Sequence, residues 1–511
     1  MFETLALNAP SWSDLRHFVP ETVLVVTFLL ALMADLFARG RRPAGPFALA
    51  LGGCLVALAA AVSSLPAGPR SILGDLVVVD GLAGFFRVLF PLIGAITILF
   101  SWASGEIMGP RREHKGEFYA LVALMAFGMC VMASAADLIM LYLSVELVSL
   151  TSYVMAGYMR TSLRSTEASL KYVIFGSVSS GVMLYGLSLL FGLTGETTFV
   201  EIRAALLAGR ADNFALLVAM VFVLAGLGYK IAAVPFHFWC PDVYEGAPTP
   251  VTALFSVGPK AAGFALMIRF FYTTLLSPGG GQAAAGAAAP DGVIVGPADW
   301  PLLIAILSVV TMTYGNLVAL RQTNVKRLLA YSSIAHVGYL LMGFLMLTAA
   351  GLEAILFYLL VYAIMNLGAF LFVIALNNRL GGEEISDYAG LSTRAPWVAL
   401  MMMVFLLSLT GLPPTAGFIG KMYLFAEVIN RHWFWLAVVG ALNSVVSLFY
   451  YMKIAKAMYF TPGERAPLRL EPLHTAVLIL LAAPTLALGV YWTPFKNFVD
   501  RAVAGFAGLG G

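Results

Sequence analysis

Fourteen long apolar segments follow one another along this 511-residue chain, and they limit its fold more than any other feature. Each reaches or exceeds the roughly 17 to 25 residues that a transmembrane helix needs. Only 11% of the residues are charged, against about a quarter in soluble domains. The sequence therefore predicts an all-α polytopic membrane protein with about 14 transmembrane helices. The segments are 20–38, 46–65, 78–103, 118–134, 136–160, 168–193, 214–236, 248–276, 301–320, 328–349, 353–378, 395–430, 432–460 and 475–495.

Basic residues between the segments predict the orientation of the chain. The connections after odd-numbered segments hold more than twice as many lysines and arginines as the opposite side. Because such residues accumulate in cytoplasmic loops, both termini are predicted to face away from the cytoplasm. Arg16 precedes the first segment, but no small-residue cleavage site follows, so we interpret this segment as a retained span rather than a signal peptide.

Other features argue against several classes of function. A net charge of +3 without any basic run gives no support for nucleic-acid binding. Cys54, Cys130 and Cys240 are scattered, so neither a metal site nor a disulfide framework is expected. Gly226 and Gly228 are not followed by the third glycine of a dinucleotide-binding motif, and they lack its strand context.

Titratable side chains inside the apolar segments are the main functional signal, because a charge at bilayer depth is costly and by default marks an ion pathway. Arg87 is predicted to pair with Asp80, and Arg269 is predicted to reach the membrane interface. The remaining lysines have no such explanation. The basic residues in this class are Arg87, Lys171, Lys230, Lys260, Arg269 and Lys421.

The stretch 226–260 concentrates these residues. Pro235 follows Lys230 by five residues and predicts a kinked or broken helix, which a membrane tolerates only where protein or a water-filled cavity satisfies the freed backbone groups. His237 has two interpretations. Either the helix resumes and His237 shares a face with Lys230, or Pro235 ends the helix and His237 belongs to a surface loop.

Two further polar residues lie in apolar sequence. Glu146, in the middle of the fifth segment, is predicted to be protonated or paired with a lysine of a neighbouring span. His336 is either part of the same polar pathway or a residue that bridges helices by hydrogen bonds.

Matched spacings predict an internal repeat. Glu146 and His336 are 190 residues apart and Lys230 and Lys421 are 191 apart, and Pro413 and Pro414 interrupt the second stretch as Pro235 interrupts the first. Two halves of five spans would have opposite orientations in the membrane, the inverted repeat of many transporters. The predicted organisation is 1–117 (spans 1 to 3), 118–276 (first repeat), 277–300 (a Gly/Ala-rich loop), 301–460 (second repeat) and 461–511 (span 14 and tail).

The runs KIAAVPFHFWCPDVYEGAPTPVTA at 230–253 and GLPPTAGFIGK at 411–421, with the spacing of Glu146 and the lysines, resemble the antiporter-like subunits of respiratory complex I. The resemblance covers essentially the whole chain. The motif DVYEGAPTP and the presence of Lys421 are most similar to the subunit N branch of that family. The subunit M branch is expected to carry glutamate in place of Lys421.

This resemblance implies a proton path within the membrane, in which Glu146 pairs with Lys171 and Lys230, and Lys230 is the switchable carrier. Lys421 would lie near the exit, and His237 would be an accessory residue. The residues implied on the path are Glu146, Lys171, Lys230, Lys260, His336 and Lys421.

The resemblance also implies a subunit of a translocating NADH:quinone oxidoreductase (EC 7.1.1 class) that holds no cofactor and performs no redox catalysis itself. NADH, FMN, iron–sulfur clusters and quinone are expected in the rest of the complex. The expected partners are other complex I membrane subunits, including further antiporter-like subunits and small membrane subunits, and the lipid bilayer. The expected location is the bacterial inner (plasma) membrane, with both termini on the periplasmic side.

Three alternatives stay open on the sequence. An Mrp-type sodium/proton antiporter subunit shares the same repeat and lysines. A solute transporter predicts a substrate pocket beyond the polar axis, and a structural membrane scaffold would not require four lysines in its apolar segments.

Overall fold

The computed structural model describes residues 12–38, 44–66, 68–102, 104–108, 116–209, 212–276, 299–464, 466–506 and 508. Within these ranges twelve helices are long and apolar enough to cross a membrane. The prediction of an all-α multi-span protein is therefore confirmed. The Gly/Ala-rich loop predicted at 277–300 lies almost entirely outside the described residues.

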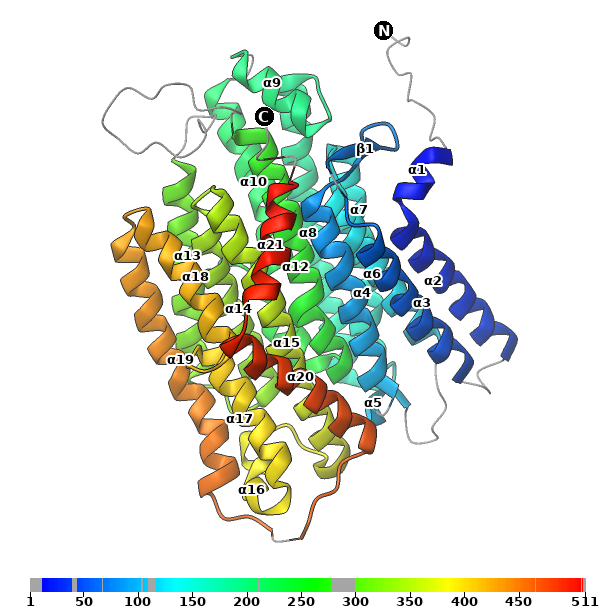
Figure 1. The fold of residues 1–511 in the computed structure, drawn as a ribbon, viewed down its shortest axis with the longest axis vertical. Coiled ribbons are helices and arrows are strands. Elements are labelled where there is room, and N and C mark those ends of the chain that lie inside the picture. Colours follow the sequence, from blue (N-terminus) through cyan, green and yellow to red (C-terminus); the bar gives the residue numbers. More distant parts are fainter. Residues whose placement is uncertain are drawn as a thin grey trace.

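The N-terminal part forms a helical hairpin at one edge of the molecule (Figure 1). Helices α2 and α3 pack against each other and against α4 and α6, and a short antiparallel hairpin of two strands follows them. Because residues 77–79 form a strand, α4 begins later than the predicted segment at 78. The elements are α1 (Trp12–His17), α2 (Val19–Ala38), α3 (Ala44–Ser63), β1 (Arg70–Ile72), β2 (Val77–Val79), α4 (Gly81–Trp102) and α5 (Gly105–Met108).

The next group of helices surrounds α12, in which all 27 residues are buried. Helices α4, α6 and α15 pack directly on it. The group comprises α6 (Glu117–Ser134), α7 (Leu138–Ala156), α8 (Leu163–Thr194), α9 (Phe199–Leu207), α10 (Asn213–Ile231), α11 (Trp239–Gly246) and α12 (Thr249–Leu275).

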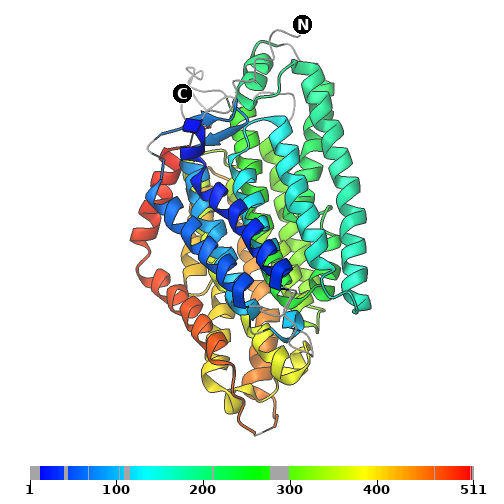
Figure 2. The same ribbon diagram turned by 90° about the vertical axis from the view of Figure 1, so that its right-hand side faces the viewer.

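A second group follows with a similar order of elements. It comprises α13 (Trp300–Ala319), α14 (Val325–Phe344), α15 (Ala349–Leu380), the 3-10 helix η1 (Ile385–Tyr388), α16 (Leu391–Arg394), α17 (Pro396–Thr410), α18 (Ala416–Asn430) and α19 (Phe434–Phe460). The chain ends with α20 (Pro472–Val490) and α21 (Thr493–Ala504), which run along the outside of the bundle in Figure 2 and contact α4 and α15.

Each of the fourteen predicted segments coincides with a helix or with a pair of shorter helices. Two of them are not among the twelve apolar spans. Helix α14 carries several charged and hydroxyl side chains along its length, and the segment 395–430 is divided into α17 and α18, which are too short individually. Both exceptions occur where polar residues interrupt apolar sequence.

Two buried ion pairs join α2 to α4 and the start of α4 to α12, and they correct one prediction. Arg87 pairs with Glu21 of α2, with 2.5 Å between Nε and Oε1, and not with Asp80. Asp80 instead accepts two hydrogen bonds from Arg269, at 2.7 and 2.8 Å. Arg269 is therefore buried against Asp80, directly before the start of α4. The partners lie far apart in sequence, so local spacing could not identify them.

Candidate functional site

Lys230 lies in the last turn of α10, immediately before the helix breaks. Asp212 caps the helix at its start by accepting a hydrogen bond from Ala215 N–H, and Ile231 ends it. Ala232 then adopts a left-handed conformation with φ of 60°, which stops further helical hydrogen bonding. Lys230 is 2% exposed, and its Nζ donates to Ser149 Oγ at 3.0 Å. The lysine is thus held inside the bundle with a hydroxyl as its neighbour.

Glu146 lies on α7, facing Ser180 of α8. The Ser180 hydroxyl donates to its carboxylate, and Glu146 lies close enough to Lys230 for the two charges to interact. Glu146 is only half-buried. The carboxylate is therefore more accessible than Lys230 beside it.

Lys171 does not pair with Glu146, contrary to what the resemblance implied. Its Nζ lies 2.7 Å from both Asp242 Oδ2 and Glu167 Oε1. Lys171 lies nine residues before Ser180 on α8, about 13 Å along the helix axis. This distance places Lys171 at a different depth from Glu146, and its side chain is 37% exposed.

A cluster of opposite charges surrounds Lys171 at the bundle surface. Arg327 Nη1 lies 2.8 Å from both Asp242 Oδ1 and Glu245 Oε2, and these residues line a cavity of about 240 Å³. Burial acts to raise the pKa of Asp242, but the hydrogen bonds from Lys171 and Arg327 outweigh it and lower the pKa below 3.8. Asp242 is therefore ionised at neutral pH and connects α8, α11 and α14.

Replacing Asp242 with asparagine is expected to reduce stability modestly, by about 1 kcal/mol at pH 7, because the pair is part-exposed. The folded-state pKa of Asp242 is depressed, so its stabilisation is present above the unfolded pKa of 3.8 and is lost as the pH falls through the folded value. Unfolding midpoints of wild type and Asp242→Asn should differ at pH 7 and converge below about pH 3. Glu464→Gln, at a mostly exposed carboxylate, is the control; an equal effect of both substitutions would contradict the prediction.

Lys260 occupies the middle of α12, next to the second half of the broken helix. Its Nζ donates to Ser333 Oγ at 2.6 Å and lies 3.8 Å from Cys240 Sγ and 5.5 Å from the ring centre of Tyr244. Lys260 is 3% exposed. It thereby connects α11 and α12 to the polar face of α14.

His336 lies one helical turn after Ser333 on α14. Its Nδ1 is 2.6 Å from Tyr358 Oη, and its Nε2 is 3.3 Å from Tyr451 Oη. Tyr451 Oη lies 2.5 Å from Ser332 Oγ. Both ring nitrogens of the histidine therefore have hydroxyl partners, an arrangement that allows a proton to be accepted on one side and released on the other.

Lys421 follows the second break, in the second turn of α18. Its Nζ donates to Leu409 O at 3.3 Å, to Thr410 O at 2.8 Å and to Ser444 Oγ at 2.8 Å. The two carbonyls are at the C-terminal end of α17, where helical partners are missing and the helix dipole favours a cation. Lys230 precedes its break whereas Lys421 follows its own, so the two lysines do not occupy equivalent positions.

His237 belongs to the connection between α10 and α11, and neither interpretation of it was right in full. The helix does not resume before Trp239, so His237 does not share a helical face with Lys230. It is nevertheless buried, at 2% exposure, with its ring against Phe238 and Tyr314. Its Nδ1 has no hydrogen-bond partner among the described residues.

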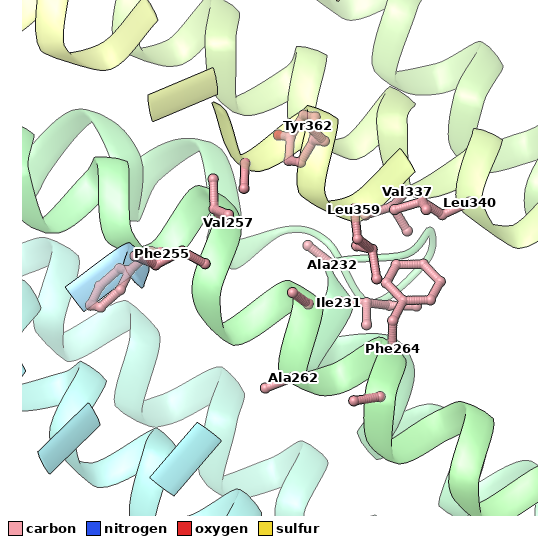
Figure 3. Close-up of a cluster of buried hydrophobic side chains, with 14 of the residues drawn as sticks. Ile231, Ala232, Phe255, Val257, Ala262, Phe264, Val337, Leu340, Leu359 and Tyr362 are labelled. Atoms are coloured by element: carbon pink, nitrogen blue, oxygen red, sulfur yellow. The ribbon is translucent and has the colours of Figure 1, made fainter. Parts of the chain in front are cut away.

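Hydroxyl groups are the members of this site that the sequence did not single out. Ser149 follows Glu146 by one turn of α7, as Ser333 precedes His336 by one turn of α14, and this helical spacing was the available signal. Tyr358, Tyr451 and Ser444 come from other helices and gave no local signal. Figure 3 shows a cluster of buried hydrophobic side chains that includes Ile231, Phe264 and Leu340.

A family model described as "NADH:quinone oxidoreductase/Mrp antiporter, TM" matches residues 135–280 and 293–447. These two ranges contain Glu146, Lys171, Lys230, Lys260, His336 and Lys421, and they cover more than half of the chain. The chain belongs to this family. Within the described ranges, no three His, Cys, Asp or Glu side chains are grouped as metal ligands.

Curated members of the NADH:quinone oxidoreductase/Mrp antiporter family match nearly the full chain. NADH-quinone oxidoreductase subunit N of Anaeromyxobacter sp. is 46% identical over 96% of this chain and 97% of its own length. NADH-quinone oxidoreductase subunit N 2 of Sorangium cellulosum is also 46% identical, over 96% of this chain and 98% of its own length.

Two solved structures have the same fold. A chain of respiratory complex I from Thermus thermophilus with bound aureothin has 29% identity and a TM-score of 0.77, covering 94% of this chain and 99% of its own. A chain of the Mrp complex from Dietzia sp. has 22% identity and a TM-score of 0.81, over 96% of this chain and 97% of its own. At that identity the second likeness concerns the fold alone.

Proposed function

We propose that this chain is the proton-translocating subunit N of an NADH:quinone oxidoreductase. One observation carries the proposal: Lys230, Lys260, His336 and Lys421 are all at most 4% exposed, and each lies against a serine or tyrosine hydroxyl. A protein that only needed to pack its helices would gain nothing from four such groups, since each is costly in a membrane. The 46% identity to curated subunit N proteins supports the same assignment.

Lys230, Lys260, His336 and Lys421, here called the row, have a chemistry that suits proton transfer. A hydroxyl both donates and accepts hydrogen bonds, so a serine or tyrosine between two basic groups can pass a proton from one to the next. The hydroxyls of Tyr244 and Tyr362 and Nδ1 of His237 are buried without a hydrogen-bond partner in the described part of the chain. Buried polar groups of this kind usually bind ordered water, which would complete the connections between the side chains.

We infer a direction of transfer from the positions of the charged groups. Glu146 is the half-buried carboxylate beside Lys230, so opening and closing this pair would change how strongly the lysine holds its proton. Lys171, in the charged cluster at the surface cavity, would supply protons to the row, and Lys421 would release them. His237 is an accessory residue beside the first break.

The driving energy would come from outside this chain. Electron transfer from NADH to quinone, through FMN and iron–sulfur clusters, takes place in other subunits and would act through conformational change. The partners are other membrane subunits of the complex, including antiporter-like and small ones. The chain would lie in the bacterial inner membrane with both termini on the periplasmic side.

The proposed architecture has 14 spans and two inverted repeats, one at 118–276 and the other at 301–460. Helix lengths support the repeat, because α8 and α15 both have 32 residues and α12 and α19 both have 27. Each half also contains a broken helix at the corresponding place in the order. The segments 1–117 and 461–511 would be additions outside the repeats.

Replacing Glu146 with glutamine tests the proposal, because it removes the charge beside Lys230 and keeps a hydrogen-bonding group for Ser180. The assembled complex in proteoliposomes is expected to lose proton pumping about tenfold, with quinone reduction reduced alongside it. Glu201→Gln, at an exposed carboxylate, is the control and should pump normally. Normal pumping by the Glu146→Gln complex would exclude the gating role.

An Mrp-type sodium/proton antiporter subunit is the second candidate, because the description of the matching family model names Mrp antiporters beside NADH:quinone oxidoreductase. The two candidates differ in what the chain does without redox partners. Vesicles containing only the purified chain should show no sodium-driven proton flux if the first proposal is right. A flux that requires Lys230 would favour the antiporter.

A further inference from the structure

The hairpin of α2 and α3 lies at the edge of the bundle (Figure 1). It carries an open apolar groove. The groove has a volume of about 360 Å³ and faces outward, with several of its side chains more than one-third exposed. Its lining residues are Leu15, Val19, Thr22, Val23, Val26, Thr27, Leu30, Leu49, Gly53 and Val56.

The groove offers nothing polar to an occupant. The hydroxyls of Thr22 and Thr27 donate to Phe18 O and Val23 O within their own helix, at 2.8 and 2.7 Å. Gly53 forms the floor, because a Cβ at this position would lie 1.9 Å from Thr27 Oγ1. The absence of a side chain at Gly53 lets the two helices approach closely and leaves a smooth hydrocarbon surface.

A cationic cavity adjoins one end of the groove. The residue at that end of the groove, Leu15, is followed directly by Arg16 and His17, which line a second cavity of about 560 Å³ together with Arg70. Arg70 Nη1 lies 3.0 Å from His17 Nε2. Among the described residues that line this cavity there is no aspartate or glutamate; the others are Ser64, Leu65, Pro66, Gly68, Pro69 and Val79.

The dimensions of the groove match one leaflet of a bilayer. Val19 and Leu30 are eleven residues apart on α2, a distance of about 16 Å along the helix axis. A single leaflet contributes about half of the roughly 30 Å hydrocarbon core. The cationic cavity therefore lies where the headgroup of a lipid in the groove would be.

We propose that the groove and the cavity together bind one anionic phospholipid. Its acyl chain lies along α2 and α3, and its phosphate is held between Arg16 and Arg70. Guanidinium groups suit this role because their fixed N–H donors match the geometry of phosphate oxygens. Charge complementarity selects a lipid with net negative charge over a zwitterionic one.

Photolabelling in native membranes tests this site with the chain in its own assembly. Phosphatidylglycerol with a photoreactive acyl chain is expected to label peptides 19–30 and 49–56 about tenfold more than phosphatidylcholine with the same chain. The double substitution Arg16→Gln/Arg70→Gln should lower phosphatidylglycerol labelling about tenfold and leave phosphatidylcholine labelling unchanged. Val26→Trp, which fills the groove, should block labelling by both probes.

Two controls keep the outcome interpretable. Arg203→Gln, at a part-buried arginine of α9 away from the hairpin, should not change labelling. Arg16→Lys/Arg70→Lys should restore most of it, which separates loss of charge from loss of folding. Equal labelling by the two probes would overturn the proposal, as would crosslinks from the groove to another polypeptide in place of the lipid.

Discussion

Replacing Lys230 with methionine is expected to reduce proton pumping by the assembled complex at least about tenfold while leaving the complex intact. Methionine keeps the length and apolar stem of lysine, and it removes one hydrogen bond, to Ser149. The bundle should therefore fold, but the row would lack its proton carrier between Glu146 and Lys260. Pumping and quinone reduction are measured together in proteoliposomes made with the purified complex.

Lys230→Arg separates charge from proton transfer. Arginine keeps the positive charge but does not release its proton, so this variant should also fail to pump. Lys453→Met is the matched control, because Lys453 donates to the Leu320 carbonyl at a helix end outside the row and its loss should have no effect. Pumping by either Lys230 variant at the wild-type rate would mean that this lysine is structural.

Replacing Arg269 with leucine is expected to destabilise the protein by about 3 to 5 kcal/mol, because it breaks a buried ion pair and removes both guanidinium hydrogen bonds from the Asp80 carboxylate. Asp80 is fully buried and accepts two hydrogen bonds from Arg269, and Arg269 Nε also donates to Ala133 O at 2.8 Å. The free energy of unfolding in detergent provides the measurement.

The double substitution Asp80→Leu/Arg269→Leu should recover most of this stability, since neither charge then remains in the core. Arg379→Leu is the control, because its pair with Glu471 is exposed and contributes at most about 1 kcal/mol. A loss from Arg269→Leu no larger than that from Arg379→Leu would show that solvent reaches Asp80.

Helix positions were predictable because a membrane span requires a long apolar run, and every predicted run coincides with helix. The breaks were predictable to within a few residues from their prolines. The first begins at Ala232, before Pro235, and the second at Gly411, where a left-handed glycine ends α17 before Pro413. In both cases a left-handed residue ends the helix two or three residues ahead of the proline.

Charge partners were much harder to predict. Asp80 and Arg87 are close in sequence, yet Asp80 pairs with Arg269, which is 189 residues away. Lys171 likewise pairs with Asp242 of the short helix α11. Such pairs depend on which helices pack together, and that information is not present in local periodicity. The burial of Lys230, Lys260 and Lys421 was predictable because each has apolar sequence on both sides.

The contacts of Lys421 have a mechanical consequence. An ammonium group has three N–H donors, and here each of them meets a different acceptor, two of which are the terminal carbonyls of α17. A neutral amine has only two donors, so loss of the proton removes one of these three hydrogen bonds. Thr410 O also accepts from Ser444 Oγ at 2.9 Å and keeps that partner, so the longer bond to Leu409 O, at 3.3 Å, is the one most readily lost. Each turnover would then loosen and restore the link between Lys421 and the end of α17.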